Sequence, residues 1–321
     1  MNNGKIYSTI IFILFAWNAQ AQTQRINFTY PLLYPEGVAY EGGRQSFIVS
    51  SVTTGTVGRV DAQGNYTKLY EDAGLKSSFG MKVDAKRNRL WVCTGDPNYS
   101  HYADSATYKK MIRLIGIDLS TGKKVEDIDL SKLYAGKHFA NDLALDDAGN
   151  IYITDSYSPV IYKVDPQMKA TVLTASDWFK AEDIGLNGIA WSPKGYLIVD
   201  NNSTGALFKI DLRDPQRITR IKTTAFFPGA DGLLWNAAGN LVMAQNKGTN
   251  RIVEFTSKDN WQSADLQSST AATDRFIQPS TLALRDGQLF ALNSKLNELS
   301  DPTAPPSKEF SLQLVRLIPV H

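Results

Sequence analysis

Four oxygen-bearing residues hold the same place in a short phrase that recurs along the chain. The phrase is a polar residue, a small residue and then an apolar run, as in Glu36-Gly37-Val38-Ala39-Tyr40 and Asn187-Gly188-Ile189-Ala190-Trp191. The four positions are Glu36, Asn141, Asn187 and Asp231. If the phrases are equivalent parts of one repeated unit, these side chains meet in the fold. Two carboxylates and two amide oxygens that meet can bind a metal ion.

This donor set decides which metals are candidates. Carboxylate and amide oxygens are hard donors that select Ca²⁺, Mg²⁺ or Mn²⁺, whereas zinc prefers His and Cys. The chain has 3 histidines without metal-ligand spacing and a single cysteine, which argues against zinc. Asp231 is shorter than Glu36 and is the better candidate for a general base that shares the ion with an attacking water. The alternative is that Asn and Asp stand at strand starts because they hydrogen-bond the adjacent backbone.

The spacing of the phrase predicts the elements that position these residues. It occurs six times at intervals of roughly 40 to 60 residues, with the remaining two copies beginning at Phe79 and, loosely, at Ser280. Short strands repeated at roughly this period are typical of a β-propeller with one blade per repeat. Turn sequences such as Asp147-Ala148-Gly149-Asn150 separate the strands of a blade. We therefore predict an all-β fold, a six-bladed β-propeller.

Two insertions and one unassigned strand complete this prediction. Blades 2 and 6 carry extra residues between their second and third strands, around 96–102 and over 295–308. Because adjacent strands are antiparallel, both insertions are expected on the face of the candidate metal ligands, beside Glu36, where long loops usually bind ligands. The alternating segment 25–30 is expected to close the ring as the outer strand of blade 6.

The beginning of the chain predicts export. Lys5, an apolar stretch over residues 6–17 and Ala19-Gln20-Ala21 are the three parts of a cleavable signal peptide, residues 1–21. The apolar stretch is shorter than the roughly 20 residues that span a membrane. We expect no stable membrane anchor and a mature protein, residues 22–321, that forms a single propeller domain in the periplasm or outside the cell. The net charge of +2, with both signs interspersed, predicts no nucleic-acid binding.

Several side chains on the same face are candidates for contacting a small-molecule substrate. Phe79 occupies the ring position of blade 2 and is expected to form an apolar wall. The candidates for substrate binding are Phe79, Tyr99, His101, Asp155, Asn202 and Gln245. His101 could shuttle a proton and His138 could orient a ligand, although a histidine on an exposed loop is more often simply solvated.

The phrases Pro35-Glu36-Gly37, Asn141-Asp142, Leu186-Asn187-Gly188 and Ala230-Asp231-Gly232 resemble those of the regucalcin/gluconolactonase-like family, also called the senescence marker protein family. The resemblance covers essentially the whole mature chain. In that family a Glu, two Asn and an Asp bind one divalent cation, usually calcium, and the Asp is the proposed base in the hydrolysis of sugar lactones. It therefore implies Ca²⁺ as the cofactor and Asp231 as the catalytic residue. The inserted loops match no family pattern and leave the substrate open.

Two functions of different classes follow from these observations. The first is an exported, divalent-metal-dependent hydrolase of a small cyclic ester, a sugar lactone by resemblance. The same metal chemistry would also permit hydrolysis of phosphotriesters or aryl esters. The second is a non-catalytic NHL-like propeller that binds a ligand or partner on its axial face. The four-residue donor set favours the hydrolase, because a binding module has no need for two carboxylates and two amides at the axis.

Overall fold

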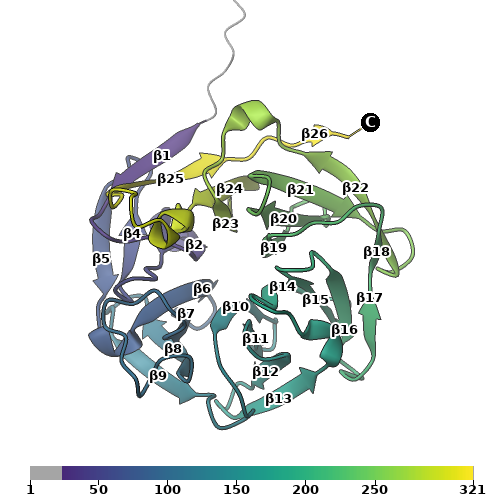
Figure 1. The fold of residues 1–321 in the computed structure, drawn as a ribbon, viewed down its shortest axis with the longest axis horizontal. Coiled ribbons are helices and arrows are strands. Elements are labelled where there is room, and N and C mark those ends of the chain that lie inside the picture. Colours follow the sequence, from purple (N-terminus) through teal and green to yellow (C-terminus); the bar gives the residue numbers. More distant parts are fainter. Residues whose placement is uncertain (1–23, 321) are drawn as a thin grey trace, which may run out of the picture.

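The computed structural model describes residues 24–320, which form six sheets around one axis (Figure 1). The predicted all-β, six-bladed β-propeller is confirmed. The predicted signal peptide lies outside the described residues. Within residues 24–320, no helix is both long and apolar enough to cross a membrane.

Each blade is an antiparallel sheet whose strands follow one another from the axis outward. Blade 1 consists of β2 (Val38–Glu41), β3 (Ser46–Val49), β4 (Val57–Val60) and β5 (Tyr66–Tyr70). Blade 2 consists of β6 (Ser77–Asp84), β7 (Arg89–Gly95), β8 (Ile112–Asp118) and β9 (Lys124–Asp129). Blade 3 consists of β10 (Ala140–Leu145), β11 (Ile151–Asp155), β12 (Val160–Val164) and β13 (Ala170–Ala175). Blade 4 consists of β14 (Leu186–Ser192), β15 (Tyr196–Asn201), β16 (Leu207–Asp211) and β17 (Ile218–Arg220). Blade 5 consists of β19 (Ala230–Trp235), β20 (Leu241–Gln245), β21 (Arg251–Thr256) and β22 (Ser263–Ser269). Blade 6 consists of β23 (Pro279–Arg285), β24 (Gln288–Asn293), β25 (Glu309–Leu314) and β1 (Arg25–Thr29).

The connections contain short 3₁₀ turns and two additional strands. The turns are η1 (Gly42–Arg44), η2 (Ala73–Leu75), η3 (Asp177–Phe179), η4 (Ala272–Asp274) and η5 (Leu296–Ser300). The strand β18 (Lys222–Thr223) runs parallel to β22, and β26 (Ile318–Pro319) runs antiparallel to it. Both predicted insertions are present, as residues 96–111 between β7 and β8 and residues 294–308 between β24 and β25.

The strand β1 closes the ring, as the sequence predicts. It pairs antiparallel with β25, so that segments from opposite ends of the chain complete blade 6. Ile26 and Phe28 are buried while their neighbours along the strand are exposed, which is the alternation expected of an outer strand with one face on the core. Pairing of β1 with β25 removes the open edge that blade 6 would otherwise present.

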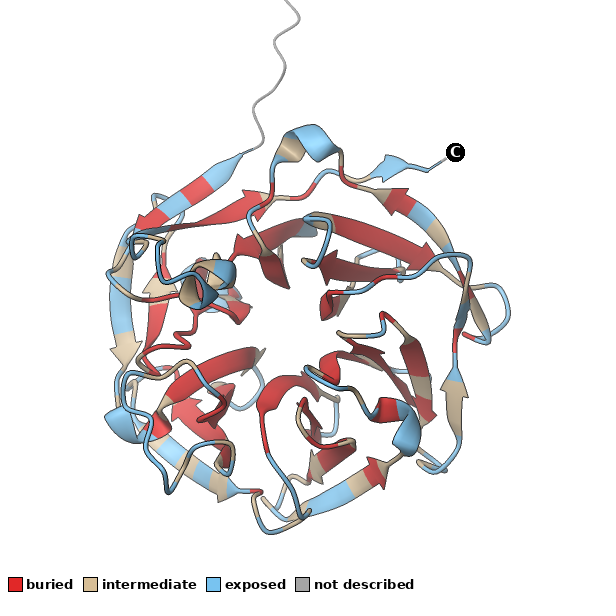
Figure 2. Cartoon of the chain, viewed as in Figure 1, coloured by how far each residue is buried: buried red, intermediate tan, exposed pale blue. Residues whose placement is uncertain are grey.

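Burial follows the distance of a strand from the axis. The inner strands are buried almost throughout, because neighbouring blades pack on both of their faces (Figure 2). The outermost strands alternate, as in β9, where no residue is fully buried. The apolar core therefore lies between blades, and polar side chains near the axis lie within it.

Five of the six innermost strands carry a β-bulge where they approach the axis. In blade 3, Ala140 pairs with Asp155 and Leu143 with Ile153, so Asn141 and Asp142 together oppose one residue of β11. The same shift occurs in β6, β14, β19 and β23. A bulge redirects side chains and is frequent beside functional sites. Here every bulge falls on the first two residues of the recurring phrase.

The substitution Phe28→Ala tests closure by β1. Phe28 is 2% exposed and its ring lies 6.1 Å from that of Phe310 across the strand pair. We expect a loss of about 3–4 kcal/mol in the free energy of unfolding, because a large buried side chain leaves a cavity. Urea unfolding of the mature protein measures this, with the exposed neighbour Asn27→Ala as control, expected to change stability by less than about 0.5 kcal/mol. Equal stability of the two variants would contradict closure by this strand.

Candidate metal centre

Three of the four predicted metal ligands occupy bulge positions at the axis, and the fourth, Glu36, lies just before its innermost strand. Asn141, Asn187 and Asp231 are the first bulge residues of β10, β14 and β19. Glu36 is positioned differently, because it precedes β2 and lies outside any bulge. The Ser50 hydroxyl holds its backbone by accepting hydrogen bonds from the N–H groups of Glu36 and Gly37 at 3.3 and 2.7 Å. The innermost strands of adjacent blades lie side by side, which brings the four positions around one axis.

These side chains are buried and yet leave acceptors free. Glu36, Asn141, Asn187 and Asp231 are only 6%, 3%, 4% and 6% exposed. The atoms Glu36 Oε2, Asn141 Oδ1 and Asn187 Oδ1 have no hydrogen-bond partner among the described residues. A buried acceptor without a partner costs free energy, on the order of 1–3 kcal/mol. Three such oxygens around one axis are the feature expected of a cation site.

Side chains on the second strands orient two of the candidate ligands. The Asn141 amide nitrogen donates to the Ser156 hydroxyl at 2.9 Å, which leaves its carbonyl oxygen free for the axis. The Asn246 amide nitrogen donates to Asp231 Oδ2 at 2.6 Å, and the Gly232 N–H donates to Asp231 Oδ1 at 2.9 Å. Ser156 and Asn246 stand at the same place in their blades, directly after β11 and β20.

Hydrogen bonds between blades hold the ring together at this level. The hydroxyls of Ser280 and Thr281 in blade 6 donate to the backbone oxygen of Glu36 at 2.7 and 2.8 Å. The Thr154 hydroxyl of blade 3 donates to the backbone oxygen of Asn187 at 2.6 Å. The Asn202 amide of blade 4 donates to the backbone oxygen of Ala230, next to Asp231, at 2.9 Å. The positions of Glu36, Asn187 and Asp231 therefore depend on hydrogen bonds from a neighbouring blade.

The axis carries more negative than positive charge. Burial raises the pKa of Glu36 and Asp231 well above the usual range, and the charge of Asp231 adds to the effect on Glu36. Burial also raises the pKa of Asp142 and Asp200, which have one unpartnered carboxylate oxygen each. The single cation described as offsetting these carboxylates is Lys82, whose Nζ lies 3.7 Å from Asp142 Oδ1.

The four side chains fit a divalent cation with hard donors, although of these only Glu36, Asn141 and Asn187 have an oxygen without a hydrogen-bond partner in the described part of the chain. Two carboxylates and two amide oxygens match the preference of Ca²⁺ or Mg²⁺ for oxygen, and the positive charge would relieve the repulsion between Glu36 and Asp231. In residues 24–320 no group of three or more His, Cys, Asp or Glu is placed to hold a metal. A site on the axis therefore needs the two asparagines as well as the two acids.

Two of the predicted substrate residues lie together beside this ring. Phe79 is fully buried, with its ring 4.6 Å from Phe139 and 6.4 Å from Tyr99. Burial raises the pKa of Tyr99 to about 12, and the charges of Asp183, Glu36 and Asp231 act in the same direction, which puts the phenol within the field of the candidate ligands. Phe139 was not among the predicted residues, although its place two residues before Asn141 was a usable signal.

Three other predicted substrate residues use their polar atoms within the protein. Asp155 is fully buried and accepts hydrogen bonds from His138 Nδ1, the Tyr162 hydroxyl and the Phe139 N–H at 2.7, 3.2 and 2.9 Å. Gln245 bonds Arg251 and the backbone of Pro228, and Asn202 bonds blade 5 as described above. A role in substrate binding stays a prediction for all three.

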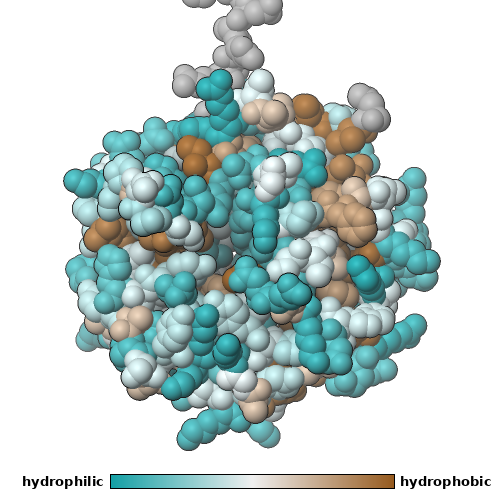
Figure 3. All heavy atoms as spheres, in the orientation of Figure 1, coloured by the Kyte–Doolittle hydropathy of each residue, from teal (hydrophilic) through white to brown (hydrophobic). Residues whose placement is uncertain are grey.

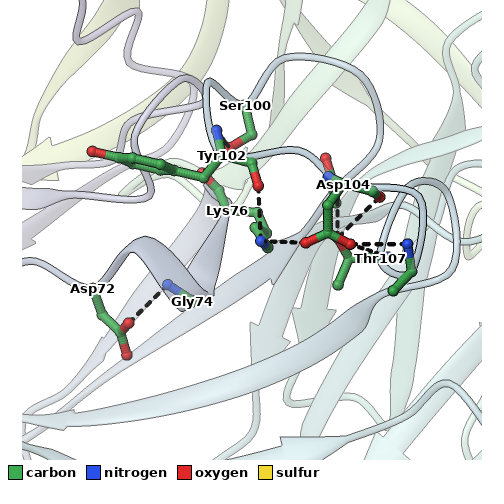
Figure 4. Close-up of polar contacts among 9 residues, drawn as sticks. Asp72, Gly74, Lys76, Ser100, Tyr102, Asp104 and Thr107 are labelled. Atoms are coloured by element: carbon green, nitrogen blue, oxygen red, sulfur yellow. Dashed lines mark hydrogen bonds and ion pairs between the residues drawn. The ribbon is translucent and has the colours of Figure 1, made fainter.

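The blade 2 insertion brings Tyr99 and His101 to the ring face. His101 is exposed, and its N–H donates to the backbone oxygen of Thr53 in blade 1. Lys76 fastens the same insertion, because its ammonium group contacts the Tyr102 backbone oxygen at 2.8 Å and Asp104 Oδ2 at 2.7 Å (Figure 4). The hydrogen bond from Lys76 lowers the pKa of Asp104 to about 2. On the other side, the Tyr34 hydroxyl of the chain before blade 1 donates to Glu298 of the blade 6 insertion at 3.1 Å.

The raised pKa values predict how the metal-free protein responds to pH. Folded protein retains protons on Glu36, Asp200 and Asp231 that the unfolded chain releases above about pH 4. Stability that is fully present below that pH is therefore lost as the pH rises through the raised pKa values. Surface carboxylates with a lowered pKa, such as Asp104, titrate below this range. We expect the melting temperature in chelator to fall from pH 5.5 to pH 8, and Glu36→Gln to reduce the fall.

Differential scanning fluorimetry with and without saturating calcium measures this dependence. Calcium is expected to raise the melting temperature most at pH 8, because it binds the ionised carboxylates. A metal-free protein that is more stable at pH 8 than at pH 5.5 would contradict the account of the axis.

Comparisons with known proteins give the family of the chain and solved structures with a similar fold. The family model described as the SMP-30/gluconolactonase/LRE-like region matches residues 34–272. No curated protein matches the sequence. Among solved structures, the major allergen Mala s 1 of Malassezia sympodialis is 18% identical, with a TM-score of 0.73, over 92% of this chain and 96% of that chain.

Two further solved structures show the range of proteins that share the fold. A gluconolactonase from Xanthomonas campestris is 15% identical, with a TM-score of 0.60, over 92% of this chain and 91% of that chain. A catalytically inactive variant of virginiamycin B lyase from Staphylococcus aureus, solved with quinupristin, is 13% identical, with a TM-score of 0.56, over 91% of this chain and 99% of that chain. At these identities the structures show the fold alone. The family model covers most of the chain, and the protein belongs to the SMP-30/gluconolactonase/LRE-like family, as a lactonase-like β-propeller.

Proposed function

We propose that this chain is an exported hydrolase of a small cyclic ester, a sugar lactone, that depends on one divalent cation, Ca²⁺. Glu36, Asn141, Asn187 and Asp231 would hold the cation. The observation that carries the proposal is the set of three buried, unpartnered oxygens that Glu36, Asn141 and Asn187 place around the axis, beside the buried carboxylate of Asp231. Such a set is costly for a fold that only has to pack, and it is explained if a bound cation uses it.

The cation, when bound, supplies a positive charge that stabilises the charge developing on the ester carbonyl oxygen. Asp231 then takes a proton from the water that attacks the carbonyl carbon. The oxygen of this water bonds the carbonyl carbon, the bond between this carbon and the ring oxygen breaks, and the ring oxygen takes up the proton that Asp231 had accepted, so that a hydroxy acid is released and Asp231 is again ionised. Hydrogen bonds from Asn246 and Gly232 fix the Asp231 carboxylate in the position from which it can accept the proton.

The surroundings of the ring suit a small, partly apolar substrate. Tyr99 is a partly exposed aromatic ring beside the candidate ligands, backed by the buried rings of Phe79 and Phe139, and such a ring packs against the C–H groups of a sugar. The insertion fastened by Lys76 carries Tyr99, so loop position and substrate fit are linked. The predicted signal peptide supports a periplasmic or secreted enzyme.

Two substitutions separate catalysis from metal binding. Asp231→Asn keeps an oxygen ligand but removes the base, so we expect the turnover number measured at saturating calcium, which compensates for the lost charge, to fall by about 10²–10⁴-fold. Glu36→Gln removes one of two balancing charges, so calcium affinity should fall about tenfold or more. Hydrolysis of a panel of lactones and calorimetric titration of calcium measure the two effects, with exposed Asp177→Asn as control.

The outcomes distinguish the proposed functions. Hydrolysis that survives a chelator, or full activity of Asp231→Asn, would show that the mechanism is wrong. Calcium binding without hydrolysis of any lactone, aryl ester or phosphotriester would favour a non-catalytic binding propeller.

A further inference from the structure

A cavity of about 230 Å³ lies at the outer part of blade 4, away from the axis. It is lined by Trp178, Thr204, Ala206, Phe208 and Arg220. Trp178 belongs to the connection that leads from β13 to the ring residue of β14, and Thr204 to the turn between β15 and β16. Both connections open on the face where the innermost strands begin. The cavity therefore opens on the same face as the candidate metal centre.

Aromatic side chains form the apolar part of this cavity. Phe208 is 2% exposed, and the Trp178 ring is stacked on it with 6.3 Å between centroids and 28° between planes. At this distance the two rings are in direct contact, so no ligand ring fits between them. Trp178 is nevertheless 56% exposed, which leaves indole surface open to solvent. An exposed tryptophan held by a buried aromatic ring is a rigid platform for stacking.

A guanidinium group supplies the polar part. Arg220 is the cross-strand partner of Phe208, so its side chain leaves the sheet on the same face. Arg220 is exposed, and within residues 24–320 no hydrogen bond or ion pair joins its guanidinium group to another side chain or backbone group. The Thr204 hydroxyl, at the same cavity, accepts a hydrogen bond from the Ala206 N–H and still has its own proton to donate.

A second cavity shows what distinguishes this arrangement. It has a volume of about 470 Å³ and lies at the corresponding place on blade 2. There Arg113 is paired with Asp127 and Asp129, and Lys124 is paired with Asp72 and Asp127. Those cations are already neutralised by neighbouring carboxylates. On the face seen in Figure 3, hydrophilic side chains predominate and hydrophobic ones form separate patches.

We propose that the blade 4 cavity binds a pyranose ring that carries a carboxylate, a hexuronate. The apolar face of the ring lies on Trp178, Arg220 holds the carboxylate through two parallel N–H···O bonds, and Thr204 bonds a ring hydroxyl. The volume suits one ring rather than an extended ligand. This site is independent of catalysis at the axis.

Saturation-transfer difference NMR with D-glucuronate as the probe tests the proposal on the mature protein. We expect saturable binding with a dissociation constant on the order of 1 mM, and much weaker binding of D-glucose, which lacks the carboxylate. Arg220→Gln and Trp178→Ala should each weaken binding about tenfold. Arg217→Gln, an exposed arginine near the same strand, should leave it unchanged, and thermal melting checks that each variant is folded.

Three results would overturn the proposal. These are no saturable binding of glucuronate, equal binding by Arg220→Gln and wild type, and equal binding of glucose and glucuronate. Benzoate is the probe for a planar aromatic acid, and benzoate binding without glucuronate binding would show that the site selects flat rings instead of sugars. Asp231→Asn, which disables the proposed reaction, should bind glucuronate normally, so this test and the test of hydrolysis fail separately.

Discussion

The innermost strand of five blades carries an extra residue where it meets the axis, and in blades 4 and 5 a side chain of the neighbouring blade bonds the backbone at or beside that point. In blades 3 and 4 the bulge holds Asn141 and Asn187, and the Thr154 hydroxyl joins the two blades through the Asn187 carbonyl. In a regular ladder, successive side chains point to opposite faces of the sheet. The bulge changes this alternation, and the candidate donor set depends on it.

The same arrangement concentrates charge in a place where charge is expensive. Glu36, Asp142, Asp200 and Asp231 are all buried, and Lys82 is the cation described beside them. Burial alone would favour their protonated forms. A bound cation reverses this preference, which links the stability of the propeller to its proposed activity. A loss of stability at the functional site is common in enzymes, and here it concerns residues that hydrogen bonds from neighbouring blades help to hold.

The number of blades, the closing strand and the positions of both insertions could be predicted from the sequence, because each depends on periodicity and on alternation within a strand. The register of the recurring phrase also identified the four candidate ligands, since equivalent positions in a propeller converge. The bulges could not be predicted, because the same amino-acid sequence is compatible with a regular ladder and with a ladder that contains one extra residue. Without them, the capping of Gly188 by Asp200 and the orientation of Asp231 by Asn246 were not evident. Asp155 was predicted to bind substrate because its strand ends near the face of the candidate metal ligands. Its carboxylate instead accepts hydrogen bonds from His138 and Tyr162, which only the three-dimensional contacts reveal.

The central claim is that one cation lies on the axis among Glu36, Asn141, Asn187 and Asp231. The most direct measurement is a crystal structure of the mature protein grown in calcium, with the ion located by anomalous scattering. The account predicts a single peak on the axis, with one oxygen of each of these four residues within about 2.3–2.6 Å. No ion at the axis in saturating calcium, or an ion held by Asp142 and Asp200 instead, would contradict it.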